Sequence, residues 1–265
     1  MSRIFDFTDA IVRRPGSSVV KGLRAGGGDD PTLAGVLAEH AGYVAALRSA
    51  GLTVQELDPL EDFPDAIFVE DPALVFTEGA ILLRPGAPSR EGEGQFLRAV
   101  LHSRFERVLE QTDGYADGGD VLVMPDALSS GRAFIGLSAR TDRTGAEALG
   151  RLLEELGYRA VVAETPPEVL HLKTASSLVD EETVLATAPL AASGIFAGYR
   201  VLEVPTGEEG GANVLRVRDC LLVGASYPRL ADLLDGYGAE VVVLPNAEIA
   251  KIDAGFTCMS LRWRA

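Results

Sequence analysis

A cysteine near the C-terminal end carries the most reactive side chain in this sequence. Cys258 follows Asp253 and Gly255 within the segment 249–261. A thiol serves either as a small buried hydrophobe or as a nucleophile, and a glycine among polar residues allows a ligand to approach closely. We therefore take Cys258 as a candidate nucleophile, with a packed thiol as the alternative. The other cysteine, Cys220, lies in an apolar, strand-like run and is expected to be packed.

Acidic residues gather at the ends of two apolar runs. Asp65 precedes the run 66–69, which we expect to form a buried strand, and Glu70 and Asp71 follow it. Adjacent carboxylates beside apolar segments are costly to bury unless they bind a partner. The sequence Asp117-Gly-Gly-Asp120 opens a second apolar run. Its glycines allow the close approach of a ligand, and an ordinary hairpin turn is the alternative.

Histidine is scarce, and patterns typical of metal ligands are absent from the sequence. Of three histidines, His40 and His102 fall in helix-like segments, where we expect surface positions. His171 stands beside Lys173 at a strand-like edge, where it is a candidate acid or base, with a structural role as the alternative. Neither His nor Cys pairs show metal-ligand spacing, and no glycine-rich phosphate motif occurs. The sequence therefore predicts no metal and no cofactor.

Composition limits the classes of partner. The chain has 265 residues, 47% of them hydrophobic and 24% charged, which is enough for an ordinary globular core. A formal charge of −15 argues against nucleic acid or an anionic membrane as a partner and favours a neutral or cationic ligand, although acidity also serves solubility. No apolar run approaches about 18 residues, and the acidic start does not resemble a signal peptide. We therefore expect a cytoplasmic protein with two free thiols.

A short β-rich phrase recurs five times and indicates the architecture. The copies lie at 51–57, 105–110, 157–162, 198–204 and 238–244. Their starts are 54, 52, 41 and 40 residues apart, which is a period typical of repeated supersecondary units in rings and solenoids. Helices are predicted at 37–47, 144–156 and 230–234. Further strands are predicted at 66–69, 80–83, 120–124, 133–137, 183–187 and 220–224. These elements predict an α/β fold of five strand-rich units in a propeller-like ring.

Six segments, in order along nearly the whole chain, resemble the dimethylarginine dimethylaminohydrolase family of the guanidine-modifying pentein superfamily. They are 63–71, 84–90, Asp117-Gly-Gly-Asp120, 136–141, His171-Leu-Lys-Thr174 and 251–261. The resemblance implies one pentein domain over residues 1–265, a five-bladed α/β propeller with pseudo-fivefold symmetry and ββαβ-like repeats. It also implies a mobile N-terminal lid near residues 16–31, where three glycines at 26–28 impose little backbone order. The implied activity is hydrolysis of Nω-methylated L-arginines to L-citrulline and dimethylamine or methylamine.

The resemblance also assigns roles to individual residues. It implies that Cys258 forms a covalent thiouronium intermediate, that His171 is the general acid and base, and that Asp117 is the partner of His171. The residues expected to bind the substrate are Asp71 at the guanidinium, Arg90 and Arg140 at the α-carboxylate, and Asp65, Leu23 and the Ile252 main chain at the α-amino group, with Glu70 and Asp253 nearby. The implied partner is a small cationic amino acid, and the implied assembly is a monomer or homodimer.

Two alternative functions use the same fold. An arginine deiminase acts on unmethylated arginine, is longer, and carries an acid two residues after its histidine, where this chain has Lys173. We expect the loss of that acid to leave room for N-methyl groups. A non-catalytic amino-acid-binding pentein would require a broken set of Cys, His and carboxylates, and here the set is intact. The segment 125–131 departs from the family as an insertion, which we expect to form a surface hairpin.

Overall fold

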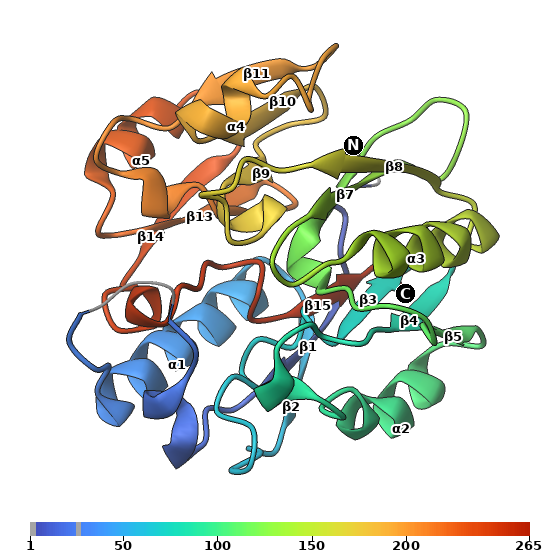
Figure 1. Ribbon diagram of the computed structural model, residues 1–265. Coiled ribbons are helices and arrows are strands. Elements are labelled where there is room, and N and C mark those ends of the chain that lie inside the picture. The colour runs from blue at the N-terminus through green and yellow to red at the C-terminus, as the bar shows by residue number, and fades with distance from the viewer. Residues whose placement is uncertain (1–3, 25–27) are drawn as a thin grey trace.

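The computed structural model of the protein describes residues 4–24 and 28–265, which form five small β-sheets around a common axis (Figure 1). Each sheet has three strands. The first strand of each unit pairs antiparallel with the second, and the second pairs in parallel with a third strand that follows a helix. The predicted five-bladed α/β propeller with ββαβ-like repeats is therefore confirmed.

The strands group by sheet in the order in which they pair. The sheets are β15 (Leu261–Trp263), β1 (Asp9–Arg13) and β2 (Thr53–Leu57); β3 (Ala73–Phe76), β4 (Gly79–Leu82) and β5 (Val108–Glu110); β6 (Val121–Met124), β7 (Arg132–Leu137) and β8 (Arg159–Glu164); β9 (Ser176–Leu178), β10 (Thr183–Ala186) and β11 (Arg200–Glu203); β12 (Leu215–Val217), β13 (Cys220–Gly224) and β14 (Glu240–Leu244). The helices, one per unit, are α1 (Leu33–Ser49), α2 (Gln95–Arg104), α3 (Arg143–Glu155), α4 (Ala188–Ala192) and α5 (Pro228–Leu234).

The recurring β-rich phrases all form the third strand of a unit, namely β2, β5, β8, β11 and β14. The helices predicted before three of them are present as α1, α3 and α5. In α3, the Asp142 side chain caps the helix by accepting a hydrogen bond from the Gly145 N–H, and the apolar side packs with Ile135 of β7. Figure 1 shows α1, α2 and α3 toward the outside of the ring. The apolar clusters also join neighbouring units, since α1 shares its cluster with Leu215 of β12 and Leu222 of β13.

One sheet joins the two ends of the chain. β1 lies between β15, where Ala10 is opposite Arg262, and β2, where Val12 is opposite Glu56. The repeat pattern predicts neither β1 nor β15, because both are short and their pairing connects opposite ends of the sequence. Cys258 directly precedes β15. The position of the candidate nucleophile therefore depends on this closure of the ring.

Three local predictions meet different outcomes. The strand predicted at 66–69 is wrong: the segment forms successive turns, in which the Phe68 N–H donates to the Asp65 carbonyl and the Asp71 N–H to the Phe68 carbonyl. Its apolar side chains are buried without any sheet pairing. His102 is exposed as expected, whereas His40 is buried in α1.

Two segments outside the regular repeat were also predicted from the sequence, namely the surface hairpin at 125–131 and the N-terminal lid near 16–31. Residues 125–131 connect the antiparallel strands β6 and β7, with Leu128 exposed, so the predicted surface hairpin is confirmed. Of the predicted lid, residues 25–27 lie outside the described residues, and residues 17–21 form a 3-10 turn. The mobility of this lid stays a prediction. No helix within residues 4–24 and 28–265 is both long and apolar enough to cross a membrane.

Candidate active site

Each of the five units contributes one loop to the site, namely the loop that leads into its first strand. These loops carry Asp71 before β3, Asp117 before β6, His171 before β9, Asn213 before β12 and Cys258 before β15. Asp71, His171 and Cys258 line one pocket; Asp117 contacts His171, and Asn213 contacts Cys258. Residues from across the whole chain therefore converge because the pseudo-fivefold repeat places equivalent loops together.

His171 and Asp117 form a buried pair. The imidazole Nε2 lies 3.0 Å from Asp117 Oδ2, and the other carboxylate oxygen of Asp117 accepts a hydrogen bond of 2.8 Å from the Gly86 N–H. Burial disfavours a charged imidazole, but the hydrogen bond to Asp117 and the negative charges of Asp120 and Asp71 outweigh it and raise the pKa of His171 to about 9. His171 is therefore a cation at neutral pH and can donate a proton.

Cys258 is a buried thiol in the same pocket. Burial raises the pKa of this thiol to about 12; the charges of Asp71 and Glu70 add to that effect, and the Gly255 N–H and the Lys173 ammonium oppose it. The thiol is therefore neutral in the unliganded protein. At neutral pH the thiolate is therefore a minor species, and a positive charge that enters the pocket would increase its population.

Asp71 is held as an anion between a cation and the Asp117-Gly-Gly-Asp120 turn. Burial opposes its ionisation, but the charges of Arg90 and His171 outweigh it and lower the pKa of Asp71. Its Oδ1 accepts a hydrogen bond of 3.2 Å from the Gly119 N–H. A side chain at position 119 would approach Asp71 Oδ1 to 2.9 Å and the His171 ring to 3.0 Å, so this turn requires glycine.

Arg90 lines the pocket, but its guanidinium is already bound. It donates to the carboxylates of Asp71 and Glu93 and to the Phe68 carbonyl. Glu93 was not identified from the sequence, although its i,i+3 spacing from Arg90 was a usable signal. Arg140 also lines the pocket and has no carboxylate partner among the described residues. It is therefore the arginine more available to bind an anionic group.

The residues expected at the α-amino group also come together. The Leu23 N–H donates a hydrogen bond of 2.8 Å to Asp65 Oδ1, and Leu23, Asp65, Ile252 and Asp253 line the pocket. Burial raises the pKa of Asp65 against the opposing charge of Arg90. The pocket encloses about 40 Å³, far below the roughly 300 Å³ typical of small-ligand sites. In this conformation the pocket is therefore too small to enclose an amino acid.

Glu70 is the one expected substrate-binding residue that does not line this pocket. Its Oε1 binds Lys173 Nζ at 2.7 Å and Arg262 Nη2 at 3.1 Å, and all three side chains are almost fully buried. Glu70 and Asp71 are adjacent in a turn, and their side chains point to different cavities. Lys173 likewise points away from the pocket, whereas Thr174 lines it. The expectation that the loss of an acid at position 173 leaves room for N-methyl groups stays a prediction, because Lys173 itself does not line the pocket.

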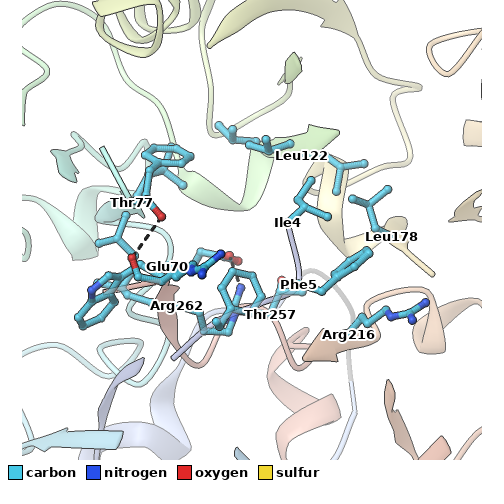
Figure 2. A pocket seen from close by; sticks show the side chains of 18 of the residues that line it. Ile4, Phe5, Glu70, Thr77, Leu122, Leu178, Arg216, Thr257 and Arg262 are labelled. Carbon is cyan, nitrogen blue, oxygen red and sulfur yellow. Dashed lines mark hydrogen bonds and ion pairs between the residues drawn. The ribbon is translucent and has the colours of Figure 1, made fainter. Parts of the chain in front are cut away.

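A larger cavity of about 1040 Å³ lies along the axis, lined by the first strand of all five units. Figure 2 shows Ile4, Phe5, Leu122 and Leu178 on one side of this cavity and Glu70, Thr257 and Arg262 on the other. The Glu70–Lys173 ion pair forms part of the wall of this cavity. Asp71 and Thr174, the next residue after each of them in the sequence, line the smaller pocket that contains Cys258. A buried ion pair therefore stands between the two cavities.

Asp120 connects the loops around the pocket through buried hydrogen bonds. Its Oδ1 accepts a hydrogen bond of 2.9 Å from the Leu172 N–H, and its Oδ2 accepts hydrogen bonds of 2.7 Å from both the Ser138 and Thr141 hydroxyls. The Ser138 hydroxyl oxygen accepts from the Arg140 N–H, and that of Thr141 from the Asp117 N–H. A single buried carboxylate thus fixes the loops that carry two pocket residues, Arg140 and His171, and the histidine's partner Asp117.

Three of these groups resemble a metal-binding cluster. Ligand atoms of Asp71, Asp117 and His171 lie within 4.8 Å of one another. His171 Nε2 already binds Asp117 Oδ2 at 3.0 Å, and Asp71 already binds Arg90 and the Gly119 N–H, so all three groups have partners without a metal ion. The two carboxylates instead suit a planar cation with several N–H donors, such as a guanidinium.

Comparison with known proteins identifies close relatives. A protein-family model described as N,N dimethylarginine dimethylhydrolase, eukaryotic, matches residues 28–188. The N(G),N(G)-dimethylarginine dimethylaminohydrolase of Pseudomonas aeruginosa is 33% identical over 97% of this chain and 100% of its own length. The protein of the same name from Streptomyces coelicolor is 37% identical over 96% of each chain. The structure of a Cys-to-Ser mutant of the Pseudomonas aeruginosa protein complexed with citrulline superposes with a TM-score of 0.92, at 33% identity over 97% of this chain and 100% of the other.

Proposed function

This chain belongs to the dimethylarginine dimethylaminohydrolase family, and on that premise we propose that it hydrolyses Nω-methylated L-arginines to L-citrulline and dimethylamine or methylamine. The observation that carries the proposal is the convergence of Cys258, the His171–Asp117 pair and Asp71 on one buried pocket. A relative that is similar over nearly the whole chain has been captured with citrulline, the product expected here. The enzyme is thus a hydrolase of C–N bonds in linear amidines.

The pocket offers complementary charge along the whole length of an arginine derivative. In this proposal Asp71 and Asp117 bind guanidinium nitrogens next to the thiol. Arg140 binds the α-carboxylate, with Arg90 contributing through its one remaining N–H donor. Asp65, together with the carbonyl groups of Leu23 and Ile252 and the nearby Asp253, receives the α-amino group. Glu70 supports the site from the neighbouring cavity rather than contacting the substrate.

The substrate ionises its own nucleophile in this scheme. A guanidinium about 4 Å from the sulfur, at an effective dielectric constant near 20, favours the thiolate by about 4 kcal/mol, or about three pKa units. The thiol proton leaves to solvent as the cation binds. The Cys258 thiolate then adds to the guanidinium carbon, and the charge of the substrate is neutralised in the tetrahedral adduct.

His171 handles protons in both halves of the reaction. It first protonates the departing amine, which leaves a thiouronium cation on Cys258 and a neutral imidazole. The neutral imidazole then takes a proton from a water molecule that attacks the thiouronium carbon. Collapse of the second adduct expels the Cys258 thiolate, and the hydroxyl proton of the adduct passes to solvent, which gives citrulline. Asp117 keeps the imidazole oriented and supports its charged form throughout.

The test is direct incubation with asymmetric dimethylarginine. We expect citrulline and dimethylamine to appear in equal amounts, with no turnover by Cys258→Ser and near-normal turnover by Cys220→Ser, since Cys220 lies outside the pocket. Unmethylated arginine serves as the competing substrate. Faster release of ammonia from arginine than of dimethylamine from the methylated compound would assign the chain to the deiminase activity instead. Binding of the methylated amino acid without any product would assign it to the non-catalytic class.

We further propose a cytoplasmic location and a role in amino-acid metabolism. Both cysteines are free thiols, which suits a reducing compartment. All substrate contacts of the proposed site come from a single chain, so a monomer is sufficient for activity. Light scattering during size-exclusion chromatography will distinguish a monomer from a homodimer.

A further inference from the structure

Of the five equivalent loops, the one before β12 has no role in the proposed reaction so far. Four of these loops carry residues with a role in the proposed reaction: Asp71, Asp117, His171 and Cys258. The remaining loop, before β12, carries Asn213. We propose that Asn213 is a further catalytic residue, whose side-chain amide donates a hydrogen bond to the Cys258 sulfur and stabilises its thiolate. The proposal rests on the function proposed above, in which that thiolate is first the nucleophile and then the leaving group.

The contact is direct and its orientation is determined. Asn213 Nδ2 lies 3.6 Å from Cys258 Sγ, within hydrogen-bonding range for sulfur. Asn213 Oδ1 accepts a hydrogen bond of 2.9 Å from the Thr257 N–H. A backbone N–H only donates, so the oxygen of the amide must face Thr257 and the nitrogen must face the sulfur. Asn213 is buried, so bulk water does not compete for this donor.

Asn213 also holds the turn that presents the thiol. Its main-chain carbonyl accepts from the Phe256 N–H at 3.3 Å, so it binds three consecutive residues, 256 to 258, with three different groups. A Cβ atom at position 255 would lie 2.3 Å from Asn213 Cβ, so Gly255 is needed for the asparagine to fit. The glycine that first marked Cys258 in the sequence is therefore explained by a partner from another unit.

The electrostatics of the pocket give this donor its importance. Burial, Asp71 and Glu70 all raise the pKa of the Cys258 thiol, and the Gly255 N–H is a backbone donor that opposes them. A hydrogen bond to a charged group changes the population of that charged form by roughly 10- to 100-fold. Asn213 and the Gly255 N–H together supply two donors to the sulfur, as an oxyanion hole does for oxygen.

The experiment measures thiol ionisation without any substrate, in a Cys220→Ser background. The readout is the pH dependence of Cys258 alkylation by chloroacetamide. We expect Asn213→Ala to slow alkylation roughly 10-fold at fixed pH and to move the profile upward by about one unit. Asn213→Asp keeps the acceptor for the Thr257 N–H but replaces the donor with a negative charge, so its shift should be larger. With methylarginine, kcat should fall by a similar factor while KM stays within about threefold.

Asn246→Asp is the matched control. Asn246 is also buried and also accepts a backbone N–H, from Ser226, at 3.2 Å, but it lies outside the catalytic pocket. Its variant should leave the alkylation profile unchanged. An unchanged profile in Asn213→Ala, or an equal shift in Asn246→Asp, would overturn the proposal. Because alkylation needs no turnover, the result stands even if methylarginine proves not to be the substrate.

Discussion

The thiol of Cys258 should respond to the charge of whatever enters its pocket. Chloroacetamide and chloroacetamidine are nearly the same size and lose the same chloride, but only the amidine is a cation at neutral pH. The neutral reagent reacts only with the small fraction of Cys258 that is ionised without a bound cation. The cationic reagent brings the positive charge that the substrate's guanidinium would supply. Comparing them therefore isolates the electrostatic step of the mechanism.

The expected magnitude follows from the pKa of about 12 for the thiol of Cys258. At pH 7 such a thiol is ionised in only about one molecule in 10⁵. A cation about 4 Å away at an effective dielectric constant near 20 lowers the pKa by about three units, which raises the thiolate fraction to about one in 10². After division by the intrinsic reactivity of each reagent toward free cysteine, chloroacetamidine should inactivate the enzyme roughly 10³ times faster than chloroacetamide.

The assay follows loss of citrulline formation with time in the Cys220→Ser background, so that only Cys258 reacts. Mass spectrometry of the modified protein, with Cys258→Ser as the unreactive control, confirms the site. Between pH 6 and 10 the chloroacetamide rate should rise tenfold per unit without a plateau. A plateau with a midpoint near 8.5, the ordinary thiol value, or a corrected rate ratio near one, would refute ionisation by the substrate.

Three further predictions concern the groups around the thiol. Because its pKa is raised, the charged form of His171 stabilises the fold below pH 6.5, and this stability is lost as pH rises through about 9. In a pH–rate profile kcat should fall over the same upper range, and Asp117→Asn should move that fall to lower pH. Lys173→Met should lower the free energy of unfolding in urea by about 1–3 kcal/mol, because it removes one of the two buried cations that bind Glu70 and leaves Arg262 as the other. The double variant Glu70→Gln/Lys173→Met should recover part of the loss, and equal losses would contradict this account. Asp120→Asn should reduce kcat/KM by roughly 10²-fold by loosening three loops at once, an expectation that fails if steady-state kinetics match the wild type.

Local patterns were sufficient to predict much of the fold. The third strands β2, β5, β8, β11 and β14 recur with a regular period, and α3 shows its apolar face in the spacing of its leucines. These signals depend on residues close together in sequence, so one chain is enough to detect them. The candidate site residues Asp71, Asp117, His171 and Cys258 were likewise marked by their chemistry beside glycine or apolar runs. Their assigned roles came from similarity to a family.

The direction of a side chain in a turn follows no periodic rule, and here only the tertiary structure decided it. Glu70 and Asp71 are neighbours, yet one binds Lys173 in the axial cavity and the other faces the thiol. Asn213 gave no signal in the sequence, since its role depends on contact with a residue 45 positions away. The sequence therefore determined which units repeat and which side chains are able to react. The ring decided which of them meet, because closing it through β1 and β15 brings five loops, distant along the chain, around one sulfur atom.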